Sequence, residues 1–299
     1  MREGRSPAFY ILAAFFAAYV LFLYGPMFAI FVLSFQGPDG GLTFPMNGVS
    51  IYWFKHLFFE GTGVINIDVS FVRSLKLGFT VALITVVFSV SAGMAFRKKF
   101  FGQTLVFYVA IASLIVPSII TSLGIALEFR LIDDWVKANQ SWLPAFLFGD
   151  FQTSMGLFTS GLAAHLTWTL PFGLLIMFAI FNRFDPRYEE AARDLGATPW
   201  QTFRYVVLPI ILPSVVGIGL FGFTLSWDEI ARSSQAIGPV NTLPLDLQGL
   251  TTTVTNPDIY ALGTSTTAVS FVVIALALFV IGQLQKKQNS LGSDAGKGV

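Results

Sequence analysis

Six long stretches of apolar residues, none containing Asp, Glu, Lys or Arg, constrain this chain more than any other feature. A helix of about 20 apolar residues crosses the hydrocarbon core of a bilayer. Only 12% of the 299 residues are charged, whereas soluble domains carry about 25%. The sequence therefore predicts an all-α integral membrane protein with six transmembrane helices. The stretches are roughly Ala8–Phe35, Leu77–Phe96, Thr104–Leu127, Met155–Phe181, Leu208–Trp227 and Ala261–Gly282.

The distribution of Lys and Arg between the connecting segments predicts the orientation of the chain. With the N-terminus inside, the inner segments hold 12 of the 18 basic residues and the outer segments hold six. The short turn Arg97–Gly102 is the clearest marker, because short loops follow the positive-inside rule best. We therefore expect both termini to be cytoplasmic. We also expect one transmembrane domain over residues 1–285 and a disordered, Gly/Ser-rich cytoplasmic tail over residues 286–299. The aromatic stretch Ser50–Glu60 predicts a short helix along the membrane interface.

Several kinds of chemistry find no support in the sequence. The net charge of +1 argues against a nucleic-acid partner, and the chain has no cysteine. We expect no metal or cofactor in this chain, because His165, which lies within a span, has no second His, Cys or acid at metal-binding spacing. Residues 217–222 spell G-x-G-x-x-G, but they lie inside an apolar stretch and predict a helix-packing face rather than a nucleotide site. A P-loop is also missing, and no set of catalytic side chains suggests an enzyme.

A polar segment, residues 185–208, interrupts the apolar pattern between the fourth and fifth stretches. Asp185-Pro186 predicts the start of a short helix, and Gly196 predicts its left-handed end. Thr198–Gln201 fits a capping box that opens a second helix, in which later prolines kink or delay the regular helix. Two helical turns are not stable alone. The segment is therefore either a well-capped loop between two spans or a helix that docks on a partner.

The order Glu190-Ala191-Ala192, Gly196-Ala197, Phe203, Leu208-Pro209 and Pro213 resembles the "EAA" signature of permease subunits of binding-protein-dependent ABC importers. The resemblance implies a type I ABC importer permease in the bacterial inner membrane. It also implies four kinds of partner: a lipid bilayer, a second permease subunit, a periplasmic substrate-binding protein and two ATPase subunits, which bind ATP and Mg. In that family the segment is the coupling helix, which docks on the ATPase. The resemblance assigns this role to Glu190, Ala191, Ala192, Asp194, Gly196 and Ala197.

Two acidic residues, Asp228 and Glu229, lie where the fifth stretch meets the outer surface. They either mark a helix that leaves the membrane or attract a cation at the mouth of a pathway. In the second case, Trp227 would add a cation–π contact. The region Leu225–Leu262 resembles spermidine and putrescine permeases, which implies a polyamine substrate. The positions that match are Leu225, Ser226, Asp228, Glu229, Gly238, Pro239, Thr242, Leu243, Pro244, Pro257, Ile259 and Ala261.

His165 lies in the fourth stretch, and with Pro171 and Phe172 it also resembles the polyamine type, which implies a structural or pathway-lining role. Arg232 departs from that type, because its charge would repel a polycation, and Asn256 stands where Thr is usual. Importers of other amines, aminoethylphosphonate, thiamine or ferric iron share much of the pattern. A stand-alone secondary transporter or channel would need ionisable residues within its spans, which the six stretches lack.

Overall fold

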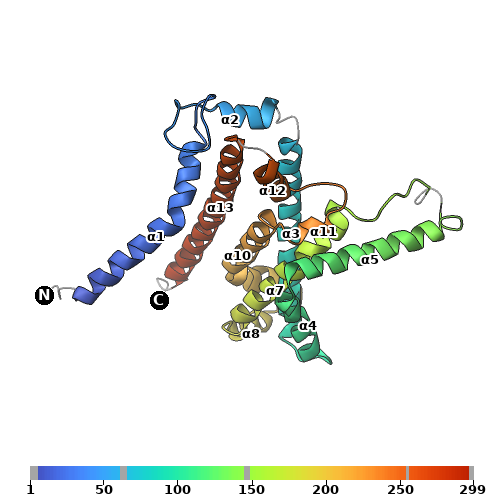
Figure 1. The fold of residues 1–299 in the computed structure, drawn as a ribbon. Coiled ribbons are helices and arrows are strands. Elements are labelled where there is room, and N and C mark those ends of the chain that lie inside the picture. The colour runs from blue at the N-terminus through green and yellow to red at the C-terminus, as the bar shows by residue number, and fades with distance from the viewer. Residues whose placement is uncertain (1–5, 61–65, 145–148, 254–255, 296–299) are drawn as a thin grey trace. The chain divides into compact units, whose positions relative to one another are not determined.

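The computed structural model describes residues 6–60, 66–144, 149–253 and 256–295, and helices dominate it (Figure 1). Within these ranges the chain forms no β-strand beyond one isolated antiparallel bridge, between Gln36 and Val49. The predicted all-α fold class is therefore confirmed. The chain divides into two compact units, which are described separately.

The first unit contains residues 1–68 and 246–269. Its helices are α1 (Pro7–Leu33), α2 (Tyr52–Lys55), the π-helical turn η1 (His56–Glu60), most of α12 (Leu243–Thr253) and the first turns of α13 (Asp258–Ala295). Trp53 and Leu57 are buried, so the amphipathic helix expected in this region is present. In η1, Nδ1 of His56 lies 3.0 Å from a carboxylate oxygen of the buried Asp258. This contact joins η1 to the first residue of α13.

The second unit contains residues 69–245 and 270–299. Its helices are α3 (Ile67–Phe96), α4 (Gln103–Ile115), α5 (Ser118–Ala138), η2 (Leu157–Gly161), α7 (Leu162–Phe181), α8 (Arg187–Asp194), α9 (Pro199–Thr202), η3 (Phe203–Val207), α10 (Leu208–Trp227), α11 (Ser233–Ala236) and the remainder of α13. All the candidate site residues named above belong to this unit.

Small residues bring α3 and α10 close together. A Cβ added to Gly222 of α10 would stand 3.1 Å from Cα of Ala82 in α3. Beside this contact, Thr85 Oγ1 donates a hydrogen bond of 2.9 Å to Thr169 Oγ1 of α7. Small residues and side-chain hydrogen bonds of this kind hold helices together in apolar surroundings. The predicted packing role of residues 217–222 is therefore present at Gly222, whereas Gly217 faces open space.

Among the described residues, five helical segments are long and apolar enough to cross a membrane, and a sixth candidate is bent. The sequence predicts a continuous span over Thr104–Leu127, but α4 and α5 meet there at an angle of 110°. That prediction was wrong because Pro117 has no N–H to donate and disfavours the helical conformation of the residue before it. Val116 accordingly adopts extended angles, with φ −69° and ψ 130°. The count of six holds if α4 and α5 together form one broken span.

Helix α13 runs through Ala295. The backbone of residues 286–295 is thus helical where the sequence predicts a disordered tail, and the expected boundary at residue 285 is not marked by a break in the helix. Residues 296–299 of the expected tail lie outside the described residues.

Candidate functional site

The polar segment between α7 and α10 folds as a short helix, a tight turn and a second helix, as the sequence predicts. At the start of α8, Asp185 Oδ1 accepts the backbone N–H of Arg187 at 3.0 Å. At the start of α9, Thr198 and Gln201 form the predicted capping box, in which each side chain accepts the other residue's backbone N–H, at 3.3 and 2.8 Å. The π-helical turn η3 then interrupts the regular helix before α10, where the sequence predicts a proline-induced delay.

The end of α8 depends on Gly196, whose φ of +83° lies in the left-handed region. Its backbone N–H donates to the carbonyl of Arg193 at 2.8 Å, and the N–H of Ala197 donates to the carbonyl of Ala192 at 3.0 Å. These two bonds form a Schellman motif, which satisfies carbonyls that the end of a helix leaves unpaired. The predicted glycine cap is therefore confirmed.

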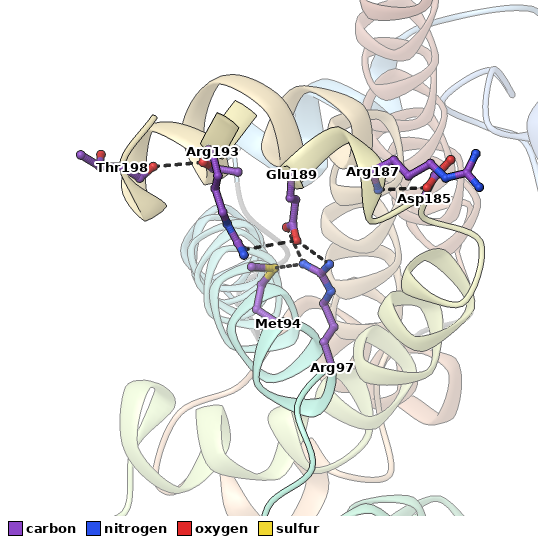
Figure 2. Close-up of polar contacts among 8 residues, drawn as sticks. Met94, Arg97, Asp185, Arg187, Glu189, Arg193 and Thr198 are labelled. Carbon is purple, nitrogen blue, oxygen red and sulfur yellow. Dashed lines mark hydrogen bonds and ion pairs between the residues drawn. The ribbon is translucent and has the colours of Figure 1, made fainter. Parts of the chain in front are cut away.

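Glu189 is the buried residue of α8, and no sequence pattern distinguished it from its neighbours. Arg97 follows the last residue of α3 and donates from Nη1 and Nη2 to both carboxylate oxygens of Glu189, at 2.7 and 2.9 Å (Figure 2). The guanidinium also lies over the rings of Phe181 and Phe184, at 4.9 and 5.2 Å. The hydrogen bonds from Arg97 hold the pKa of Glu189 below its usual range, although burial opposes them. Glu189 therefore stays ionised and anchors α8.

The rest of α8 and the turn after it expose apolar side chains. Tyr188, Leu195 and Trp200 are 56%, 90% and 64% exposed. Of the six residues to which the resemblance assigns coupling, Ala192 and Ala197 are half-buried, and the exposed ones are Glu190, Ala191, Asp194 and Gly196. Neighbouring residues on a helix point about 100° apart, so Glu190 faces outward while Glu189 is buried. An exposed apolar group beside a polar rim is typical of a surface that another protein covers.

His165 of α7 is completely buried. Its Nδ1 lies 2.8 Å from Ser226 Oγ of α10, and its Nε2 lies 2.9 Å from Ser233 Oγ of α11. The Ser233 hydroxyl donates its single proton to the carbonyl of Glu229 at 2.8 Å. Ser233 Oγ must then accept from Nε2–H, which leaves Nδ1 as the acceptor for Ser226. His165 thus joins three helices, and of its two expected roles the structural one fits this conformation.

The three residues predicted for the outer mouth of the pathway differ in exposure. Trp227 is 1% exposed and stacks on Phe223, with ring centroids 5.7 Å apart. Glu229 is 8% exposed, and its Oε1 accepts the backbone N–H of Arg232 at 2.8 Å. Burial raises the pKa of Glu229, while the Arg232 N–H and charge oppose that rise. Asp228 is exposed, although partial desolvation raises its pKa. Asp228 is therefore the acid whose side chain a solute can reach.

Arg232, which departs from the polyamine pattern, is only 2% exposed. Its guanidinium lies 5.1 Å above the ring of Trp168, and Nη1 donates to Thr167 Oγ1. Burial lowers the pKa of Arg232. Because both partners lie on α7, far away in the sequence, the local pattern around Arg232 gave no sign of these contacts. Among the described residues, no three His, Asp or Glu side chains gather closely enough to hold a metal ion.

Residues 85–287 match the model of a family described as binding-protein-dependent transport system inner membrane component. The chain is 30% identical over 284 residues to the spermidine/putrescine transport system permease protein PotC of Haemophilus influenzae, covering 94% of this chain and 98% of that protein.

Two solved structures have a similar fold. One is a bacterial ABC transporter involved in the import of the acidic polysaccharide alginate, with a TM-score of 0.61 at 14% identity, over 93% of this chain and 95% of that chain. The other is a bacterial alginate ABC transporter in complex with an alginate pentasaccharide-bound periplasmic protein, with a TM-score of 0.56 at 14% identity, over 91% of each chain. At this identity the likeness concerns the fold alone.

Proposed function

The chain belongs to the family of binding-protein-dependent transport system inner membrane components, and from this premise we propose that it forms the translocation pathway of an ATP-driven importer and couples that pathway to a separate ATPase. The observation that carries the coupling role is the exposure of α8. A two-turn helix that ends in a Schellman motif, is anchored by one mostly shielded ion pair and is otherwise largely exposed has the form of a docking element. Its outward residues Glu190, Ala191, Asp194 and Gly196, with the half-buried Ala192 and Ala197, contact the ATPase.

In the proposed assembly this chain pairs with a second permease subunit in the bacterial inner membrane. Two ATPase subunits bind ATP and Mg and dock on the cytoplasmic side, and a periplasmic protein delivers the substrate from the other side. Both termini and α8 are cytoplasmic, in line with the basic turn at Arg97. The chain carries no P-loop, so hydrolysis belongs to the ATPase subunits.

The proposed substrate is a polyamine such as spermidine or putrescine. Support comes from the 30% identity to a spermidine/putrescine permease over nearly the whole chain. The exposed carboxylate of Asp228 adds a chemical reason, because a fixed negative charge at the end of an uncharged span attracts an ammonium group. Trp227, Glu229 and His165 are buried in this conformation, and we assign them a supporting role beside Asp228.

Site-specific cross-linking tests the coupling role, and the absence of cysteine from the chain allows single-cysteine variants to be made directly. Ala191→Cys, on the exposed face of α8, should cross-link to an ATPase subunit in the assembled transporter and react with a membrane-impermeant maleimide only from the cytoplasmic side. The matched control is Ser141→Cys, which is exposed after α5 and expected outside. It should react from the outer side only and give no cross-link. An active transporter whose Ala191→Cys variant reacts from outside would contradict the proposal.

A further inference from the structure

The ion pair between Arg97 and Glu189 joins two helices that lie far apart along the chain. Arg97 follows the end of α3, whereas Glu189 lies in α8, and α4, α5, η2 and α7 separate them in sequence. The backbone connects α8 only to α7 and α9, through short loops. The orientation of α8 relative to α3 is therefore set by side-chain contacts, and Glu189 is the residue of α8 that is buried.

The geometry of this pair fixes the orientation of the guanidinium relative to the carboxylate as well as the distance between them. The two parallel hydrogen bonds of 2.7 and 2.9 Å use both terminal nitrogens of Arg97 and both oxygens of Glu189 (Figure 2). Arg–carboxylate forks of this kind hold the two planar groups in one orientation, which a lysine ammonium cannot do. Both side chains are mostly shielded, with 22% and 11% exposed, so water and salt screen the pair less than a surface ion pair.

Arg97 is itself held in place by contacts with α7 and the residues after it. Its guanidinium lies over the rings of Phe181 at the end of α7 and Phe184 just beyond it. One turn earlier in α3, a Cβ on Gly93 would stand only 2.7 Å from Cβ of Met177 in α7. The ends of α3 and α7 are thus in close contact, and Glu189 attaches α8 to that common end.

We propose that the Arg97–Glu189 pair makes α8 move as one body with the adjoining ends of α3 and α7, so that Arg97 is a positioning residue for energy coupling. This inference rests on the proposed function, in which α8 receives the motion of the ATPase. A displacement of α8 would otherwise be taken up by its two short loops. With the fork intact, the displacement reaches α3. Earlier in α3, Val86, Val90 and Met94 pack against a core cluster that includes residues of α10.

Spin labels can test whether the helices move together. The assembled transporter would carry labels at Lys99→Cys and Arg187→Cys, two exposed positions beside Arg97 and at the start of α8. Pulsed electron paramagnetic resonance would measure the distance between the labels with and without ATP. We expect one narrow distribution that ATP does not shift. Arg97→Gln should broaden it, whereas Lys98→Gln, which removes an exposed neighbouring charge, should leave it narrow.

Further variants distinguish loss of the Arg97–Glu189 ion pair from a general loss of folded protein. The charge swap Arg97→Glu with Glu189→Arg should restore the narrow distribution, and Arg97→Lys should broaden it partly because the fork is lost. With spermidine as the probe, Arg97→Gln should raise the ATP hydrolysed per molecule taken up severalfold, because α8 would no longer carry the adjoining helix ends with it. The swap should reverse most of this rise, which a mere loss of folded protein would not produce.

Two results would overturn the inference: a narrow, unshifted distribution in Arg97→Gln, or a distance in the parent that changes when ATP binds. Either result leaves the Ala191→Cys cross-link to the ATPase unaffected, so the proposed function would stand. Conversely, a missing cross-link would refute the proposed function. The label distances would still show whether the Arg97–Glu189 pair holds α8 to the end of α3.

Discussion

At the scale of single residues, burial separates two acids that look equivalent in the sequence. Adjacent positions at the end of a helix point in different directions, so only one of Asp228 and Glu229 is expected to face a pathway. Glu229 is buried and accepts the backbone N–H of Arg232, which makes it part of the turn into α11. Asp228 remains exposed. The residue proposed to meet a cationic substrate is therefore Asp228.

Asp228→Asn tests that assignment with little change in shape. A charge-assisted contact contributes about 1.5–3 kcal/mol, so its loss should lower spermidine uptake about tenfold or more. Protein level, partner assembly and the affinity of the binding protein should not change. The matched variant Glu229→Gln should lower uptake less, because its carboxylate is already occupied by the chain. Uptake by Asp228→Asn at the parental rate would refute the role of this carboxylate.

Residue-scale features were predictable where they depend on near neighbours in the sequence. Gly196 and the Thr198–Gln201 box follow local rules for helix ends, and the structure has both. The partners of Glu189 and His165 lie on other helices, and the sequence alone did not pair them. Such pairs depend on how spans pack, which neither apolar length nor local capping specifies.

At the scale of elements, the sequence predicted the existence of helices better than their continuity. The apolar residues of the third stretch correctly indicated a segment apolar enough to cross a membrane. A count of apolar residues, however, does not show that the helix bends within that segment. The bend between α4 and α5 comes from the backbone restriction at Pro117, which the hydropathy pattern averages away (Figure 1). By contrast, α8 and α9 were predicted well because their caps are local.

The turn between α8 and α9 carries an element-scale prediction. Gly196→Val places a β-branched residue at a left-handed φ, which costs about 1–2 kcal/mol and favours loss of the Schellman turn. We expect normal membrane insertion, but ATP hydrolysis that no longer drives uptake, measured as ATP consumed per spermidine imported. The matched control is Gly102→Val, which imposes the same strain at φ +79° in the turn between α3 and α4. An equal loss of coupling in both variants would show that strain alone, rather than the position of α8, is responsible.

At the scale of the whole molecule, we propose a subunit that supplies a pathway but no energy source, with α8 exposed toward the cytoplasm. The family match over residues 85–287 supports that proposal, whereas the likeness to a solved ABC transporter structure at 14% identity concerns the fold alone. The sequence predicted this architecture because membrane spans and the EAA segment are encoded locally. The sequence predicted a packing face at residues 217–222, but the structure alone identified α3 as the helix that Gly222 meets.

The most direct test of this account is ATP-dependent uptake of radiolabelled spermidine into vesicles. The chain is reconstituted either alone or with its second permease subunit, ATPase subunits and binding protein. The account predicts uptake and ATP hydrolysis by the full assembly, and neither by the chain alone. ATP hydrolysis or ATP-dependent uptake by the clean chain would contradict it, as would a full, ATP-hydrolysing assembly whose uptake does not depend on ATP.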